Sequence, residues 1–185
     1  GHCTQQYESR DVLYWSTIDN ASSVSGIRRA NLNGGFQRLD LFDNRPRITG
    51  LDVDESRGNL YWLERDTATT GRILRSDLDG GNVFTLPVSP APALSQVTFP
   101  ATFDLVVNSA GGKLYWSEED KIKWANLDGS GAATLFTLPA GNDPRVERIG
   151  RMAVDRSSGK IYFAAIDQVT NAGDALAATS DSQIW

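Results

Sequence analysis

The sequence predicts an all-β protein, a β-propeller of four-stranded antiparallel blades, because three motifs recur in one fixed order. The first motif is an apolar residue, a tyrosine and an aromatic residue, at Leu13–Trp15, Leu60–Trp62, Leu114–Trp116 and Ile161–Phe163. The second is a strand-like run that ends in Asn-Gly or Asp-Gly, at Ile27–Gly34, Ile73–Gly80 and Ile122–Gly129. The third is an apolar run closed by Asp or Asn, at Gly50–Asp54, Phe103–Asn108 and Gly150–Asp155. A four-stranded unit that repeats at about 45 residues is typical of a propeller blade.

Each period supplies four short strands separated by turn residues. In the second unit we expect strands near Ile48–Asp54, Asn59–Glu64, Arg72–Asp77 and Val83–Leu86. The Asp-Gly and Asn-Gly pairs accept the positive φ angles of tight hairpin turns. No segment of the sequence shows sustained helical periodicity with caps. A sandwich of evenly spaced strands is the alternative fold, but it does not explain identical motifs at one fixed phase.

The motif positions divide the chain into repeat units. Residues 1–9 are expected to form an N-terminal tail or strand remnant, and residues 10–185 the propeller segment. The units of that segment lie near residues 10–46, 47–96, 97–146 and 147–185. The chain therefore supplies about three and a half blades.

The aromatic residues of the first motif are expected to fill the space between adjacent blades. Each blade sheet is covered on both faces by its neighbours, and large rigid side chains pack there with few rotamers to restrict. Burial of each such side chain contributes on the order of 1.5–3 kcal/mol. This predicted structural core comprises Tyr14, Trp15, Tyr61, Trp62, Tyr115, Trp116, Tyr162 and Phe163.

The three motifs together resemble the YWTD repeats, also called low-density lipoprotein receptor class B repeats, over residues 10–165. The domain of that family is a six-bladed propeller, so the resemblance implies the same ring here. The chain departs from the motif at its third and fourth positions. The family Thr is replaced by Ser16, Leu63, Ser117 and Ala164, and the family Asp by Thr17, Glu64, Glu118 and Ala165. Because that Asp is usually structural, we expect altered bonding between blades rather than another fold.

An open half-ring would expose two apolar blade faces, which is unfavourable in water. We therefore expect a second propeller half, or another chain, to close the ring. The cysteine-rich modules that flank such propellers in receptors are absent from the sequence. Lipoprotein binding is accordingly not carried over from the resemblance.

Composition limits the partners of this chain. The net charge is −5 and no basic run occurs, which argues against a nucleic-acid partner. No apolar run approaches the ~20 residues of a membrane span. Cys3 is the single cysteine, so an internal disulfide is not possible. Scarce lysine and the acceptor triplet Asn20-Ala21-Ser22 favour an extracellular or secreted protein, with Asn20 a possible glycosylation site.

Residues suited to catalysis or metal binding are few, and no catalytic residue is predicted. His2 is the only histidine and lies outside the predicted fold, so a histidine-based catalytic or metal site is not expected. Asp77–Asn82 resembles part of a calcium loop but lacks the closing Glu, and we interpret it as a hairpin turn. Asp54 and Asp155 are expected to cap turns, with a metal ion near the channel as the alternative. No cofactor is therefore expected, and calcium is the remaining possibility.

Connections between the strands fall into a short-loop face and a long-loop face. Long loops on a rigid scaffold commonly carry binding residues. On the long-loop face Pro87–Pro100, with four prolines, is expected to be an extended insertion or else a flexible loop. The charged side chains there fit either a solvated rim or a patch that grips a polar partner. The candidate binding residues are Arg45, Arg47, Arg65, Phe99, Glu119, Asp120 and Arg145.

These features favour a non-catalytic binding module that presents its long-loop face to a protein or glycan partner. One alternative is an enzyme on a propeller scaffold, such as a lyase, a lactonase or a strictosidine synthase-like catalyst. Such an enzyme would need a cluster of acids or metal ligands in its central channel. A second alternative is a structural or oligomerising propeller segment.

Overall fold

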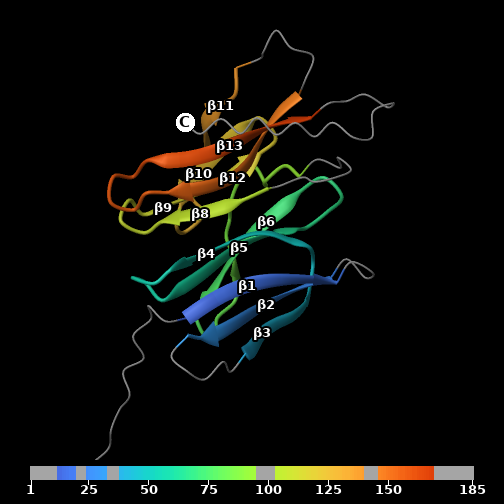
Figure 1. The fold of residues 1–185 in the computed structure, drawn as a ribbon, viewed down its shortest axis with the longest axis vertical. Coiled ribbons are helices and arrows are strands. Elements are labelled where there is room, and N and C mark those ends of the chain that lie inside the picture. Colours follow the sequence, from blue (N-terminus) through green and yellow to red (C-terminus); the bar gives the residue numbers. More distant parts are fainter. Residues whose placement is uncertain (1–11, 20–23, 33–37, 95–102, 140–145, 169–185) are drawn as a thin grey trace, which may run out of the picture. The chain divides into compact units, whose positions relative to one another are not determined.

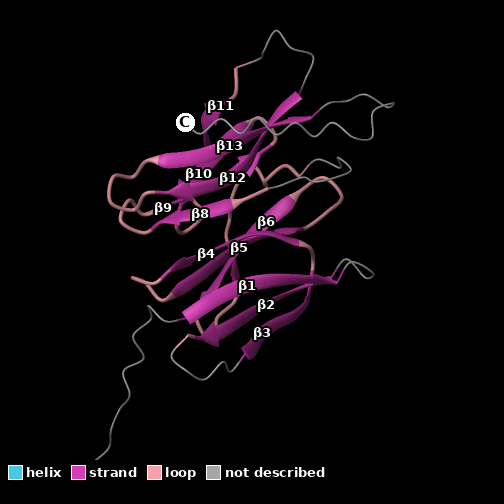
Figure 2. Ribbon diagram, viewed as in Figure 1, coloured by secondary structure: helices cyan, strands magenta, loops and turns pink. Residues whose placement is uncertain are grey.

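The computed structural model describes residues 12–19, 24–32, 38–94, 103–139 and 146–168. Their regular structure is entirely β-strand (Figure 2). The chain divides into two compact units, Gly1–Ile48 and Thr49–Trp185, which are taken in turn. The strands are β1 (Val12–Asp19), β2 (Val24–Asn31), β3 (Arg38–Arg45), β4 (Ile48–Asp54), β5 (Asn59–Arg65), β6 (Gly71–Asp77), β7 (Phe84–Thr85), β8 (Leu105–Asn108), β9 (Lys113–Glu118), β10 (Lys121–Asn126), β11 (Ala133–Thr137), β12 (Val146–Val154) and β13 (Ile161–Gln168).

In the first unit, β1, β2 and β3 form an antiparallel sheet in chain order. Ile27 and Ala30 of β2 are buried, as the apolar positions of a central strand should be. Arg28 of β2 is also largely buried, and its guanidinium forms ion pairs with Asp40 (2.8 Å) and Asp43 (2.5 Å) of β3. These pairs compensate a cation that would otherwise be costly to bury.

The second unit contains two four-stranded sheets, β4-β5-β6-β7 and β8-β9-β10-β11, followed by the pair β12-β13 (Figure 1). Each sheet follows chain order, so every connection inside it is a hairpin. The four strands predicted for residues 48–86 are present, with β4 as expected, β5 and β6 each one residue longer, and β7 two residues shorter than the predicted Val83–Leu86. Repeated antiparallel sheets of this kind confirm the predicted all-β propeller architecture; the total number of blades stays a prediction.

Glycine permits a close approach at one turn between sheets. Gly129 has φ of +88°, a left-handed conformation, in the turn that follows β10. A Cβ at Gly129 would lie 2.9 Å from the Cβ of Leu86, which follows β7 of the preceding sheet. The Asp-Gly turn therefore serves two purposes, because it closes a hairpin and lets the neighbouring blade pack against it.

Two apolar clusters hold the sheets of the second unit together. The first joins Tyr61, Leu63 and Ile73 of the β4–β7 sheet to Leu105 and Trp116 of the β8–β11 sheet. The second joins β8 and β10 to β12 and β13; it comprises Val106, Ile122, Leu138, Ile149 and Met152, with Tyr115, Val154, Ile161, Phe163 and Ala165 partly buried against it. Each core thus lies between two sheets, as expected of stacked blades.

The predicted core aromatics differ in their burial. Tyr61, Trp62 and Trp116 are buried, while Tyr14, Trp15, Tyr115 and Phe163 are half-buried. Tyr162 does not fit the prediction, because its side chain is 40% exposed whereas the equivalent Tyr61 is 1% exposed. Tyr61 packs against β8–β11, the next sheet along the chain. No strand among the described residues follows β13, so nothing described there covers Tyr162.

In two repeats, the glutamate that replaces Asp at the fourth motif position accepts a hydrogen bond from the tryptophan two residues earlier. The indole Nε1–H of Trp62 donates to Glu64 at 3.0 Å, and that of Trp116 donates to Glu118 at 2.8 Å. Residues i and i+2 of a strand share one face, which allows this bond. In the last repeat Phe163 has no N–H to donate, and Ala165 has no carboxylate to accept. Indole and carboxylate are therefore present together or absent together in these three repeats.

Part of the proline-rich insertion packs against the hairpin β5–β6. Leu94 N–H donates to the Thr69 carbonyl at 2.8 Å, and Gly71 N–H donates to the Pro92 carbonyl at 2.7 Å. The Leu94 side chain is fully buried in the first apolar cluster. Residues 86–94 are thus an ordered part of the long-loop face, whereas Phe99 lies outside the described residues.

Candidate binding site on the first strands

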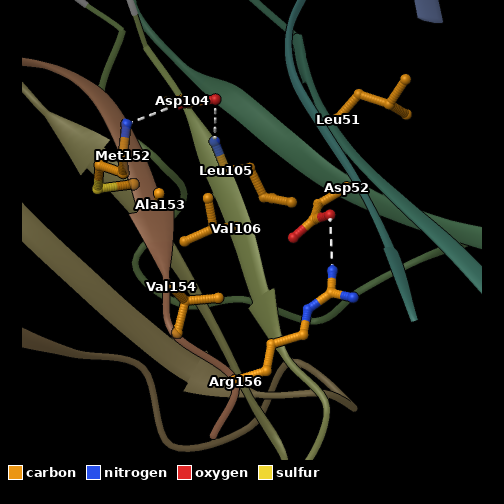
Figure 3. A pocket seen from close by; sticks show the side chains of 9 residues that line it. All are labelled: Leu51, Asp52, Asp104, Leu105, Val106, Met152, Ala153, Val154 and Arg156. Atoms are coloured by element: carbon orange, nitrogen blue, oxygen red, sulfur yellow. Dashed lines mark hydrogen bonds and ion pairs between the residues drawn. The ribbon is translucent and has the colours of Figure 1, made fainter. Parts of the chain in front are cut away.

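The first strands of three consecutive sheets, β4, β8 and β12, together line a pocket of about 390 Å³ (Figure 3). The strands approach closely, since a Cβ at Gly50 in β4 would lie 2.5 Å from the Leu105 amide nitrogen in β8. Six lining residues are apolar and three are charged. They are Leu51, Leu105, Val106, Met152, Ala153 and Val154, together with Asp52, Asp104 and Arg156.

Asp52 links β4 to β8 and to the turn after β12. One carboxylate oxygen accepts the Val107 N–H at 2.7 Å, and the other accepts the Val53 N–H at 2.8 Å. Arg156 donates to Asp52 at 3.2 Å and to the Val53 carbonyl at 3.1 Å. Burial raises the pKa of Asp52, although the backbone hydrogen bonds and Arg156 oppose that rise. Asp52 therefore links two strands and the β12–β13 turn through one charged group.

Asp104 makes the corresponding link one sheet further along. Its carboxylate accepts the Leu105 N–H at 3.0 Å and the Met152 N–H of β12 at 2.8 Å. Only 8% of the residue is exposed, and burial raises its pKa. Asp52 adds to that rise through charge repulsion, while the amides and Arg151 oppose it. Two carboxylates on adjacent first strands thus share one negative region of the pocket.

The two ends of the pocket differ. Asp104 directly precedes β8 and follows the long insertion, so it lies on the long-loop side. Arg156 lies in the β12–β13 turn on the short-loop side, and Figure 3 shows it at the opposite end of the pocket from Asp104. Because Arg156 reaches back to Asp52 and Val53 on β4, its side chain crosses the short-loop end. The geometry can hold a side chain by apolar contact and charge, with access from the long-loop side.

The candidate binding residues predicted from the sequence lie elsewhere. Arg45 and Arg47 belong to the first unit, and Arg65 donates to the Ala68 carbonyl at 2.9 Å beside β5. Glu119 and Asp120 form the β9–β10 turn, where their carbonyls accept the amides of Ile149 and Leu138. None of these five described residues lines the pocket. Phe99, Arg145 and the sequon residue Asn20 lie outside the described residues. All remain predictions.

Turn-capping roles are confirmed for the two aspartates that close first strands. Asp54 accepts the Ser56 hydroxyl at 2.6 Å and the Arg57 amide at 3.2 Å. Burial alone would raise the pKa of Asp54, but the hydrogen bonds outweigh it and the pKa is lowered. Asp155 likewise accepts the hydroxyls of Ser157 and Ser158, which lowers its pKa. In the Asp77–Asn82 turn, the Asn82 amide and the Gly81 N–H occupy carboxylate oxygens of Asp77 and Asp79.

Sequence inspection missed Asp52, Asp104 and Arg156, although a signal for the aspartates was present. Both carboxylates interrupt apolar first strands, as Leu51-Asp52-Val53 and Phe103-Asp104-Leu105. A charged residue inside an apolar strand needs a specific partner, so each marks a place where the strand meets another group. The reach of Arg156 across the turn has no comparable signal in the sequence.

Known proteins support both the fold and the repeat type. No family model matches the chain. A relative named low-density lipoprotein receptor-related protein 1, from Pyricularia oryzae (strain 70-15), is 32% identical over 124 residues, which are 62% of this chain and 38% of the relative. The chain therefore spans well under half the length of that relative.

Two solved β-propellers have the same architecture. A nidogen/laminin complex aligns with a TM-score of 0.63 and 19% identity, over 85% of this chain and 56% of the other. TolB from Acinetobacter baumannii aligns with a TM-score of 0.55 and 13% identity, over 94% of this chain and 37% of the other. The chain has a β-propeller architecture. The similarity to the receptor-related protein and to the nidogen/laminin complex supports the predicted YWTD, or low-density lipoprotein receptor class B, repeat type. Among the described residues, no helix is long and apolar enough to span a membrane.

Proposed function

We propose that this chain is a non-catalytic protein-binding module whose partner enters the pocket between β4, β8 and β12 from the long-loop side. The observation that carries the proposal is the asymmetry of that pocket, with Arg156 across its short-loop end and Asp104 at its long-loop end. Both carboxylates are engaged by backbone amides, a role that suits a rigid recognition surface better than proton transfer. The names of the relatives, a receptor-related protein and a nidogen/laminin complex, support a protein partner and an extracellular location.

Selection from a displayed random-peptide library tests this proposal without knowledge of the natural partner. Ala153 is exposed and lines the pocket from the face of β12–β13 that also carries Tyr162, so Ala153→Trp adds bulk at the edge of the pocket. Ala110 lies exposed in the β8–β9 turn and supplies the matched control, Ala110→Trp. Enriched peptides should bind the wild-type protein and Ala110→Trp equally and bind Ala153→Trp at least about tenfold more weakly, a loss of ~1.4 kcal/mol. Peptides that bind Ala153→Trp unchanged would place recognition outside the pocket.

We also propose that a further blade covers the face of β12–β13 that carries Tyr162. Tyr61 is covered by the next sheet and Tyr115 is partly covered by β12–β13, so the exposed Tyr162 marks the same face without a described neighbour. The second propeller half or another chain would supply this blade. Sedimentation velocity of the 20.2 kDa chain tests the idea. A stable, non-aggregating monomer that does not bind the apolar dye ANS would contradict it.

A further inference from the structure

Asp104 is a buried carboxylate whose charge is poorly compensated. Its hydrogen bonds come from the neutral amides of Leu105 and Met152. Within the described residues its ion pair is a long 3.8 Å contact with Arg151, whose side chain is 73% exposed. Asp52 differs, because Arg156 contacts it at 3.2 Å and is also held by the Val53 carbonyl. The pocket therefore has one carboxylate with a held cation and one without.

The surroundings of Asp104 favour a cation with an aliphatic stem. Between the charged ends the pocket is lined by Val106, Met152 and Val154, which offer apolar contact (Figure 3). Lysine and arginine combine such a stem with a charged end group. An anion is disfavoured, because it would lie beside Asp52 and Asp104 while Arg156 is already engaged.

We propose that the pocket receives a lysine or arginine side chain of the protein partner, whose cation lies at Asp104. This inference rests on the protein-binding function proposed above and specifies the chemistry of the inserted group. The Met152 amide bridges β12 to Asp104, so it reports on the carboxylate directly. Entry from the long-loop side brings the cation to Asp104 before it can meet Arg156.

Nuclear magnetic resonance titration of the intact chain tests the inference. The probe is N-acetyl-lysine N-methylamide, and the control is the uncharged norleucine analogue of similar shape. The amide resonances of Leu105 and Met152 should shift in a saturable way with the lysine compound, with a Kd about ten times lower than that of the norleucine compound. Equal binding of the two compounds, or no saturable shift at either amide, would overturn the inference.

Two variants distinguish the contribution of the Asp104 carboxylate to binding from that of the rest of the pocket. Asp104→Asn keeps an oxygen that can accept the Met152 N–H while removing the charge, so it should abolish the preference for lysine over norleucine. Because this variant can also disturb the strand, Ala153→Trp supplies an independent block and should abolish the shifts, whereas Ala110→Trp should leave them intact. Lysine binding that persists in Ala153→Trp would place the site elsewhere. Library peptides that need an open pocket but lack basic residues would leave the proposed function standing and reject a cationic group.

Discussion

Trp116 illustrates how a single side chain joins two blades. It is buried between the β4–β7 and β8–β11 sheets and donates its indole N–H to Glu118. Trp116→Ala should lower the free energy of unfolding by about 3–5 kcal/mol, because the apolar contacts are lost and a cavity is left. Urea denaturation measures the change. The exposed Tyr162 is the matched control, and Tyr162→Ala should cost less than about 1.5 kcal/mol. An unchanged midpoint for Trp116→Ala would remove this residue from the core.

Glu64 is fully buried and accepts hydrogen bonds from Trp62 and Arg72, at 3.0 and 2.9 Å. A double-mutant cycle with Trp62→Phe and Glu64→Ala isolates the indole–carboxylate bond. The two single changes should each be destabilising, and the double change should be milder than their sum by about 0.5–3 kcal/mol. We expect this non-additivity because the last repeat has Phe163 and Ala165 at the positions equivalent to Trp62 and Glu64. Strict additivity would show that indole and carboxylate act independently.

The raised pKa of Asp104 predicts how the stability of the protein depends on pH. Burial raises its pKa above the ordinary 3.8, so the folded protein binds the proton more tightly than the unfolded chain does. The contribution of Asp104 to the free energy of unfolding therefore grows as the pH falls through the raised pKa towards the unfolded value, and is lost as the pH rises. Asp104→Asn cannot titrate, so its unfolding free energy should rise less than that of the wild type between about pH 7 and pH 4. Identical pH profiles in chemical denaturation would contradict this assignment.

At the scale of elements, the contact between β4 and β8 depends on Gly50. A Cβ there would lie 2.5 Å from the Leu105 amide nitrogen, so Gly50→Ala must push the two strands apart. We expect a loss of about 1–3 kcal/mol from overpacking, with a shifted Val107 amide resonance because that amide binds Asp52. Gly58→Ala is the control, since Gly58 has φ of +68° but open space around it, and it should leave Val107 unaffected. An unmoved Val107 resonance in Gly50→Ala would contradict the close approach.

The strands themselves could be predicted closely because their signals are local. Alternating apolar residues and Asp-Gly turns placed β5 and β6 within one residue of their observed bounds. The contacts between elements were harder to predict from the sequence, because they join residues that are distant in the chain. Asp104 meets Met152 and Arg156 meets Asp52, and neither spacing follows from a turn or strand rule. The candidate binding residues were chosen by loop length and charge, which cannot distinguish Glu119 in a tight hairpin from a residue facing a pocket.

At the scale of the whole molecule, the sheets of the second unit are stacked, and each buries an apolar face against the next sheet. The first strand of each sheet is also hydrogen-bonded to the first strand of the next sheet. Asp52 and Asp104 supply those ties in two successive sheets. The next sheet carries Arg151 and Ala153 at the corresponding positions, so the same tie cannot be repeated there. We expect a blade that covers this sheet to offer an acceptor to Arg151 instead of a backbone donor.

Hydrogen–deuterium exchange of the chain with a library-selected peptide tests most directly whether the first strands form the binding site. The amides of β8 and β12 should exchange more slowly in the complex, and the effect should disappear in Ala153→Trp. The edge strand β11, which is exposed along its whole length, should be unaffected. Protection confined to β11 or to the β9–β10 turn, with β8 and β12 unchanged, would contradict a binding site on the first strands.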